Sequence, residues 1–188
     1  MALLAPLQIV ETLTTTATPE QVWAALQAAP RWPEVLSNLG QAWIDPIGEL
    51  VEDAVIRTKA APGQPYVDMD YYVLLAEPPT RLVFASRANK FRAIVDYRLR
   101  PLDDDRTELA VSAEILSETM LGRLGLATRR KAHTKGAAFS MRRRAQAMLD
   151  LAEDMASGKP AAAASIHETP GSDMEEPAAE TGGARAAD

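Results

Sequence analysis

Apolar and polar residues alternate with a period of two along several stretches between residues 42 and 115. The alternation is most regular in residues 91–99, where one face carries Phe, Ala, Val, Tyr and Leu and the other carries mainly Arg and Asp. A period of two is typical of β-strands with one buried face. Turn-forming residues interrupt it at Pro46-Ile47-Gly48, Pro62-Gly63-Gln64-Pro65, Pro78-Pro79, Ala88-Asn89-Lys90 and Asp103-Asp104-Asp105. The pattern therefore predicts an antiparallel meander.

The segment before the meander predicts one strand and two short helices. Residues 7–15 are rich in Thr, Ile and Val, which favour a strand. Thr18 and Gln21 have the spacing of a capping box, and Pro19 stands at the first helical position, where its missing N–H costs nothing. We therefore expect a helix that begins at Pro19 and a second short helix over residues 31–37.

The last predicted element is a long helix within residues 117–156. Its apolar face consists of small and flexible residues at steps of three and four: Ala138, Met141, Ala145, Met148, Ala152 and Met155. No second run of strands is left to cover the apolar face of the meander, so we expect this helix to lie across it. Gly122, Gly125 and Gly136 lower helix propensity and predict an irregular N-terminal part. The predicted fold class is α+β, a curved antiparallel sheet wrapped around a long C-terminal helix.

Composition separates one domain from a C-terminal tail. Residues 158–188 are mainly Ala, Pro, Gly, Ser and acidic residues, which cannot bury enough apolar surface to offset the entropy of ordering. We therefore expect one domain over residues 1–157 and a disordered acidic tail over residues 158–188. The sequence has no cysteine, which excludes disulfides and thiolate chemistry. The N-terminus lacks a basic leader and a sustained apolar run, so we expect a cytoplasmic protein.

The charge distribution is uneven. The net charge is −6, yet residues 119–149 contain no Asp or Glu. The eight basic residues in that stretch are Arg123, Arg129, Arg130, Lys131, Lys135, Arg142, Arg143 and Arg144. Such a helix can bind an anionic membrane surface, for which the candidates are Arg129, Arg130, Lys131, Arg142, Arg143 and Arg144. The alternative is a solvated basic helix beside an acidic sheet edge and tail, and nucleic acid is not an expected partner.

Three stretches carry a resemblance to a known superfamily over residues 5–155. They are Thr18-Pro19-Glu20-Gln21-Val22-Trp23-Ala24-Ala25-Leu26 with Arg31-Trp32-Pro33, then Glu77-Pro78-Pro79-Thr80-Arg81-Leu82-Val83-Phe84, and Tyr97-Arg98-Leu99 with Thr107-Glu108-Leu109. Together with the element order, they resemble the START-like (SRPBCC) helix-grip superfamily, especially its polyketide cyclase/dehydrase and lipid-transport branch. The resemblance implies a cavity between sheet and long helix for an apolar small molecule such as a lipid, quinone, sterol or polyketide. Members include carriers, sensors and cyclases, so the fold leaves the activity open.

Large side chains on the predicted inner faces are the candidates for the wall of this cavity. They are Trp43, Met69, Tyr71, Phe84, Phe91, Tyr97, Phe139 and Met141. The alternative is a filled core, because pockets and cores use the same side chains. Trp23 and Trp32 are expected to pack the short helices onto the sheet.

Recognisable catalytic machinery is sparse. His133 and His167 are the only histidines, His133 stands in a basic run, and neither metal ligation nor a cofactor is expected. The sequence has no Gly-x-Ser-x-Gly turn and no phosphate-binding loop after a strand. A cyclase would need acids, bases or hydrogen-bond donors inside the cavity. The candidates are Tyr71, Tyr97, Glu11 and Arg57, although a core role for both tyrosines is the alternative.

These observations favour a module that binds or transports a hydrophobic small molecule. The alternatives are an enzyme of the polyketide cyclase or aromatase type and an interaction protein that binds through its basic helix.

Overall fold

The computed structural model describes residues 5–64, 68–88, 91–102 and 105–158. Its elements, in chain order, are β1 (Leu7–Thr15), α1 (Pro19–Gln27), the 3-10 turn η2 (Ala29–Arg31), α2 (Trp32–Val35), β2 (Leu39–Asp45), β3 (Val55–Ala60), β4 (Met69–Glu77), β5 (Arg81–Ala88), β6 (Phe91–Leu102), β7 (Arg106–Ser117), α3 (Met120–Thr128) and α4 (Arg130–Ala156). The predicted tail from residue 159 onward, His167 included, lies outside the described residues, as do parts of three predicted turns.

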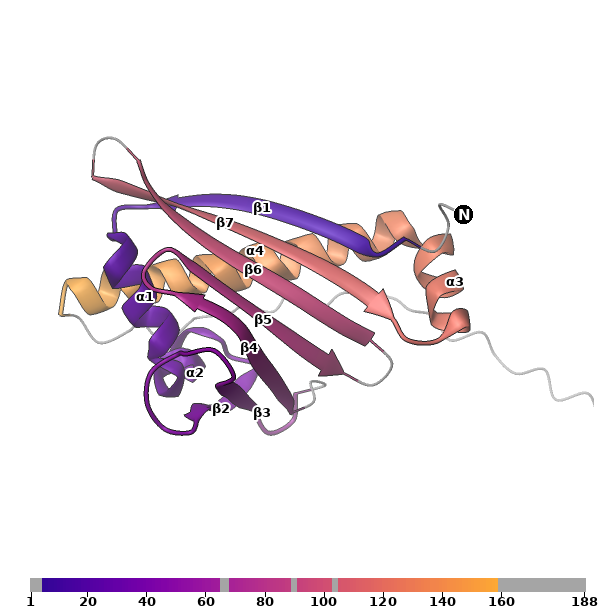
Figure 1. Cartoon of the computed structure of the whole chain (residues 1–188), viewed down its shortest axis with the longest axis horizontal. Helices are drawn as coiled ribbons and strands as arrows, with labels where there is room; N and C mark the ends of the chain where they lie inside the picture. The colour runs from indigo at the N-terminus through magenta and orange to yellow at the C-terminus, as the bar shows by residue number, and fades with distance from the viewer. Residues whose placement is uncertain (1–4, 65–67, 89–90, 103–104, 159–188) are drawn as a thin grey trace, which may run out of the picture.

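The strands form a seven-stranded antiparallel sheet in the order β1-β7-β6-β5-β4-β3-β2 (Figure 1). Strands β2 to β7 are a meander, and β1 pairs with β7 from Leu7 opposite Ile115 to Thr15 opposite Thr107. The two short helices therefore connect the two edge strands of the sheet. The predicted strands, meander and α+β class are confirmed.

The start of α1 is fixed by the predicted capping box. The Thr18 hydroxyl accepts from the Gln21 backbone N–H at 3.3 Å, and the Gln21 side chain accepts from the Thr18 N–H at 2.8 Å. The Trp32 indole N–H donates to the Ala25 carbonyl at 3.1 Å and so holds α2 against α1. This arrangement places Leu26 and Trp32 beside one end of the sheet, where both are buried.

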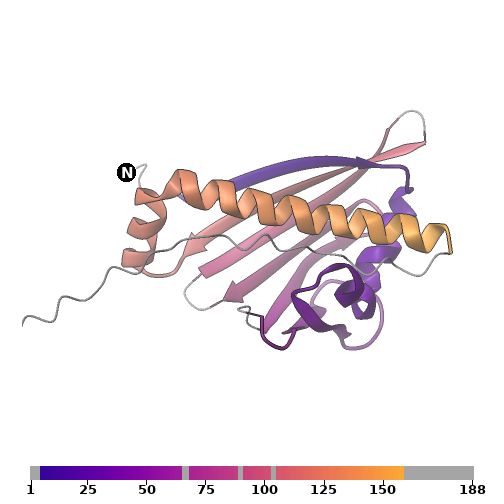
Figure 2. The ribbon, with the colours of Figure 1, turned by 180° about the vertical axis from the view of Figure 1, so that it is seen from behind.

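Helix α4 lies across one face of the sheet (Figure 2). The predicted apolar face is confirmed, and Leu149 and Leu151 join it with no exposed side-chain surface. The predicted irregularity is a break: α3 and α4 are separate helices that meet at Arg129. Near the start of α3 the backbone passes close to the end of β7, because a Cβ at Gly122 would clash with the Ser117 side chain.

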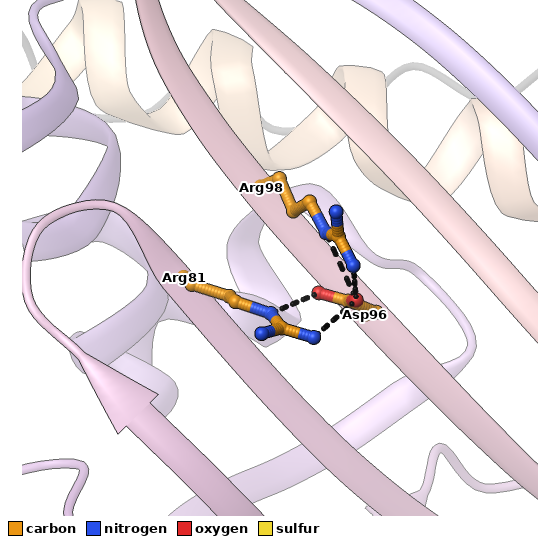
Figure 3. A network of polar contacts seen from close by, with 3 residues as sticks. All are labelled: Arg81, Asp96 and Arg98. Carbon is orange, nitrogen blue, oxygen red and sulfur yellow. Dashed lines mark hydrogen bonds and ion pairs between the residues drawn. The ribbon is translucent and has the colours of Figure 1, made fainter.

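The opposite face of the sheet carries an ionic network centred on Asp96 (Figure 3). Its carboxylate accepts from Arg81 at 3.0 and 3.1 Å and from Arg98 at 2.8 and 3.0 Å. Partial burial raises the pKa of Asp96, but the hydrogen bonds from the two guanidinium groups outweigh it and hold the pKa below its usual value. The network joins β5 to β6 on the face away from α4.

Candidate ligand-binding cavity

A cavity of about 260 Å³ lies between the sheet, α4 and the short helices. On the sheet its walls include Ile9, Ile56, Met69, Tyr71, Leu82, Phe84, Ala93, Val95, Tyr97, Ala113 and Ile115. The helical side is formed by Leu26, Trp32, Leu36, Ala137, Ser140, Met141, Arg144 and Met148. The wall is predominantly apolar, as small-molecule sites usually are. We refer to this space as the apolar cavity.

Three aromatic rings from neighbouring strands form a continuous part of this wall. The rings of Tyr71 and Phe84 meet edge to face, with centroids 5.3 Å apart and planes at 84°. Phe84 and Tyr97 are stacked at 5.6 Å and 29°. Phe84 is paired with Val73 of β4 and Val95 of β6. Each of these partners lies two residues from a tyrosine of its own strand, Tyr71 or Tyr97, so all three rings lie on one face of the sheet.

The polar groups of the wall are few, and two of them are tyrosine hydroxyls. Burial raises the pKa of Tyr97 to about 12, although the positive charge of Arg144 opposes that rise. The hydroxyl of Tyr97 therefore stays protonated at neutral pH and can donate a hydrogen bond. The Tyr71 hydroxyl donates to the Met69 Sδ at 3.7 Å. This arrangement can orient an oxygen-bearing ligand by hydrogen bonding.

Five of the predicted wall residues line the apolar cavity: Met69, Tyr71, Phe84, Tyr97 and Met141. Trp43, Phe91 and Phe139 do not. Trp43 points away because its neighbours Ala42 and Ile44 take the buried face of β2, and its ring lies 5.8 Å from the Lys59 Nζ.

Phe91 and Phe139 are largely in contact with solvent. Phe91 is the first residue of β6, at the strand end, and 41% of its side chain is exposed. Phe139 is 69% exposed, because it stands beside the apolar stripe of α4 rather than on it. The period of two or of 3.6 residues identifies a face but not how far along that face the cavity extends.

The four candidate polar residues do not converge. Glu11 shares a face of β1 with Ile9, but its carboxylate accepts from Arg142 of α4 at 3.3 Å and does not line the apolar cavity. Arg57 lies on the outer face of β3, with hydrogen bonds to Asp45 at 2.9 Å and Asp70 at 3.1 Å. Only Tyr71 and Tyr97 of the four face the apolar cavity within the described residues.

The sequence patterns predict other places for two residues of the wall. Trp32 holds the short helices together as predicted, but its ring also lines the apolar cavity. Arg144 belongs to the predicted basic surface, yet it is half-buried and lines the apolar cavity. A signal for Arg144 was present, because it follows Met141 by three residues and precedes Met148 by four, which places all three on one helical face.

The other predicted membrane contacts, Arg129, Arg130, Lys131, Arg142 and Arg143, are exposed, as is His133. Arg130 donates to the carbonyls of Ala5 and Pro6 at 3.5 and 3.0 Å. Membrane contact through this surface stays a prediction. Within the described ranges, no helix combines the length and apolar character needed to cross a bilayer. No cluster of potential metal ligands occurs in the same part of the chain.

No protein-family model and no curated protein sequence matches this chain. Solved structures do resemble it. The di-domain ARO/CYC protein StfQ from the steffimycin biosynthetic pathway is 12% identical, with a TM-score of 0.63, over 82% of this chain and 53% of that one. Norcoclaurine synthase from Thalictrum flavum, in complex with dopamine and hydroxybenzaldehyde, is 13% identical, with a TM-score of 0.58, over 84% of this chain and 92% of that one.

A third similar structure is a protein from Rhodobacter sphaeroides, 22% identical with a TM-score of 0.57, over 80% of this chain and 92% of that one. At such identities the similarity establishes the fold alone. The chain thus has the helix-grip fold that the sequence predicts. It spans 53% of the length of the di-domain ARO/CYC protein.

Proposed function

We propose that this protein binds a hydrophobic small molecule in the apolar cavity. The observation that carries the proposal is an apolar space of about 260 Å³ between the sheet and α4. A tightly packed core leaves few voids larger than a water molecule, so the size of this space supports a binding site over a packing defect. Burial of apolar ligand surface there would contribute about 25 cal/mol per Å².

The wall suits flat or flexible apolar ligands. The stacked rings of Phe84 and Tyr97 offer a surface for an aromatic group. Met69, Met141 and Met148 can adjust to different shapes, because the unbranched thioether side chain has several rotamers. The complex of norcoclaurine synthase with dopamine and hydroxybenzaldehyde supports aromatic small molecules as a ligand class for this fold.

Fluorescence titration with N-phenyl-1-naphthylamine, a neutral apolar dye, tests the proposal. Ala137→Phe places a ring from α4 into the apolar cavity and is expected to weaken binding by about tenfold or more. Ala132→Phe is the matched control, because Ala132 is exposed on the same helix and is expected to leave the affinity unchanged.

Thermal melts of both variants establish that they fold. Equal affinity of the wild type and the folded Ala137→Phe variant would contradict the proposal, as would the absence of dye binding to the wild type.

A second candidate function is cyclisation of a polyketide-like chain. The observation that favours it is the pair of hydroxyls, on Tyr71 and Tyr97, that face one apolar cavity. When solvent water takes the acidic proton between two carbonyls of the chain, the protonated Tyr97 hydroxyl can donate a hydrogen bond to the resulting enolate oxygen. The test adds the protein to a linear poly-β-ketone thioester and follows the products by mass spectrometry. Cyclisation above the spontaneous rate that Tyr97→Phe lowers supports this candidate, and an unchanged product profile excludes it.

A further inference from the structure

Arg144 is the one charged side chain on the wall of the apolar cavity among the residues that the structure describes. It is half-buried, and it makes no hydrogen bond or ion pair with any other described residue. Other arginines differ in this respect: Arg57 is paired with Asp45 and Asp70, and Arg142 of the same helix is paired with Glu11. Placing a cation in a partly buried site without a counter-charge is unfavourable unless something else compensates it.

Arg144 lies on the boundary between the apolar cavity and a second pocket. This second pocket, of about 130 Å³, lies between α4 and the segment after α2. We call it the polar pocket; its polar lining residues are Ser37, Asn38, Gln64, Ser140, Arg143 and Arg144. Asn38, Ser140 and Arg144 line the apolar cavity as well, so the two spaces share a boundary.

The charge around this boundary is of one sign. Neither pocket has an acidic residue in its described lining, and residues 119–149 contain no Asp or Glu. Arg143 adds a second positive charge in the polar pocket. The amide and hydroxyl groups of Asn38 and Ser140 can donate hydrogen bonds to an oxyanion. A planar guanidinium matches the geometry of carboxylate, sulfonate and phosphate oxygens.

We infer that the ligand is amphipathic, with its apolar body in the apolar cavity and one anionic oxygen group at Arg144. This inference rests on the proposed function, since it assigns a chemical class to the molecule that the apolar cavity holds. The anionic group compensates the charge of Arg144 and lies at the entrance to the polar pocket, where Asn38 and Ser140 supply further donors.

A matched pair of dyes tests the inference on the full chain. N-phenyl-1-naphthylamine and 8-anilinonaphthalene-1-sulfonate share the same rings, and only the second carries a sulfonate. We expect the wild type to bind the sulfonate dye more tightly. Arg144→Gln is expected to weaken binding of the sulfonate dye by about tenfold more than binding of the neutral dye, the size of one charge-assisted hydrogen bond.

Arg142→Gln is the control variant, because it removes the same charge from an exposed position on α4 that does not line either pocket. Its preference between the dyes should equal that of the wild type, and thermal melts show that each variant folds. The inference is overturned if the wild type binds the neutral dye at least as tightly as the sulfonate dye. It is also overturned if both variants lose the same affinity for the sulfonate dye. In either case the proposed function stands. If neither dye binds, the proposed function fails and the inference fails with it.

Discussion

Residues 145–156 and residues 130–144 belong to the same helix, α4, but they differ in what surrounds them. In the C-terminal segment the side chains of Ala145, Leu149 and Leu151 have no exposed surface. In the N-terminal segment most side chains are exposed, and Phe139 is 69% exposed. One helix therefore serves both as part of the core and as the cover of a cavity.

The anchoring of the C-terminal segment includes polar contacts. The Glu153 carboxylate accepts from the Thr15 hydroxyl at 2.6 Å and from the Thr16 hydroxyl and N–H at 3.0 and 3.2 Å. These bonds join α4 to the end of β1. The N-terminal segment faces the apolar cavity with small or flexible residues such as Ala137 and Met141. From the difference in burial we expect the C-terminal segment of α4 to contribute more to stability than the N-terminal segment.

The largest expected difference between the segments comes from truncating an apolar side chain in each. Leu149→Ala should lower the free energy of unfolding by about 2–5 kcal/mol, because it leaves a cavity in the core. Phe139→Ala, in the exposed segment, should change it by about 0.5 kcal/mol or less. Urea denaturation of both variants measures the difference, and equal losses would refute the division of α4 into two segments.

Loss of the hydrogen bonds from Thr15 and Thr16 to Glu153 has a smaller effect. Glu153→Ala should lower the free energy of unfolding by about 1 kcal/mol, a value reduced for the solvent exposure of this side chain. Asp150→Ala is the matched control, because its carboxylate accepts a local hydrogen bond, from Gln146 of the same helix at 2.8 Å. We expect it to cost about half a kcal/mol or less.

The hydrogen bonds to the Glu153 carboxylate also make the stability of the protein depend on pH. The hydrogen bond from Thr15 and those from Thr16 outweigh the opposing effect of burial and hold the pKa of Glu153 below its usual value. This contribution is present above about pH 4.3, the pKa of an unfolded-chain glutamate, and is lost as the pH falls through the lower folded value. The difference in unfolding free energy between wild type and Glu153→Ala should therefore shrink on acidification, and a constant difference would contradict the assignment.

The smallest expected effect is a gain in stability from a substitution in the N-terminal segment of α4. A Cβ at Gly136 would contact nothing within 4 Å, so Gly136→Ala should stabilise the protein by about 0.5–1 kcal/mol through helix propensity. Gly122→Ala in α3 should instead destabilise it, because its Cβ would clash with the Ser117 side chain. Thermal melts measure both changes, and a destabilising Gly136→Ala would show that residue 136 packs against another part of the protein.

Sequence patterns predict the helices and strands of this molecule well and the residues of the apolar cavity less completely. The capping box at Thr18 and the alternation in residues 91–99 are local signals, and each leads to the observed element. Trp43 and Arg57 were assigned inward on short strands, where the phase of the alternation is set by pairing with neighbours rather than by the strand itself.

Arg144 shows a different limit of sequence reasoning. Its charge placed it among the basic surface residues, whereas its helical spacing from Met141 placed it on the cavity side, and the structure follows the spacing. Where charge and periodicity disagree within one residue, a functional site is an expected cause.

The most direct test of a ligand cavity beneath α4 is a crystal structure of the protein with N-phenyl-1-naphthylamine bound. The account predicts the dye between the Phe84 and Tyr97 rings on one side and Met141 on the other. Dye bound only to exposed apolar residues such as Leu121, Leu124 or Phe139, with side chains filling the space beneath α4, would contradict it.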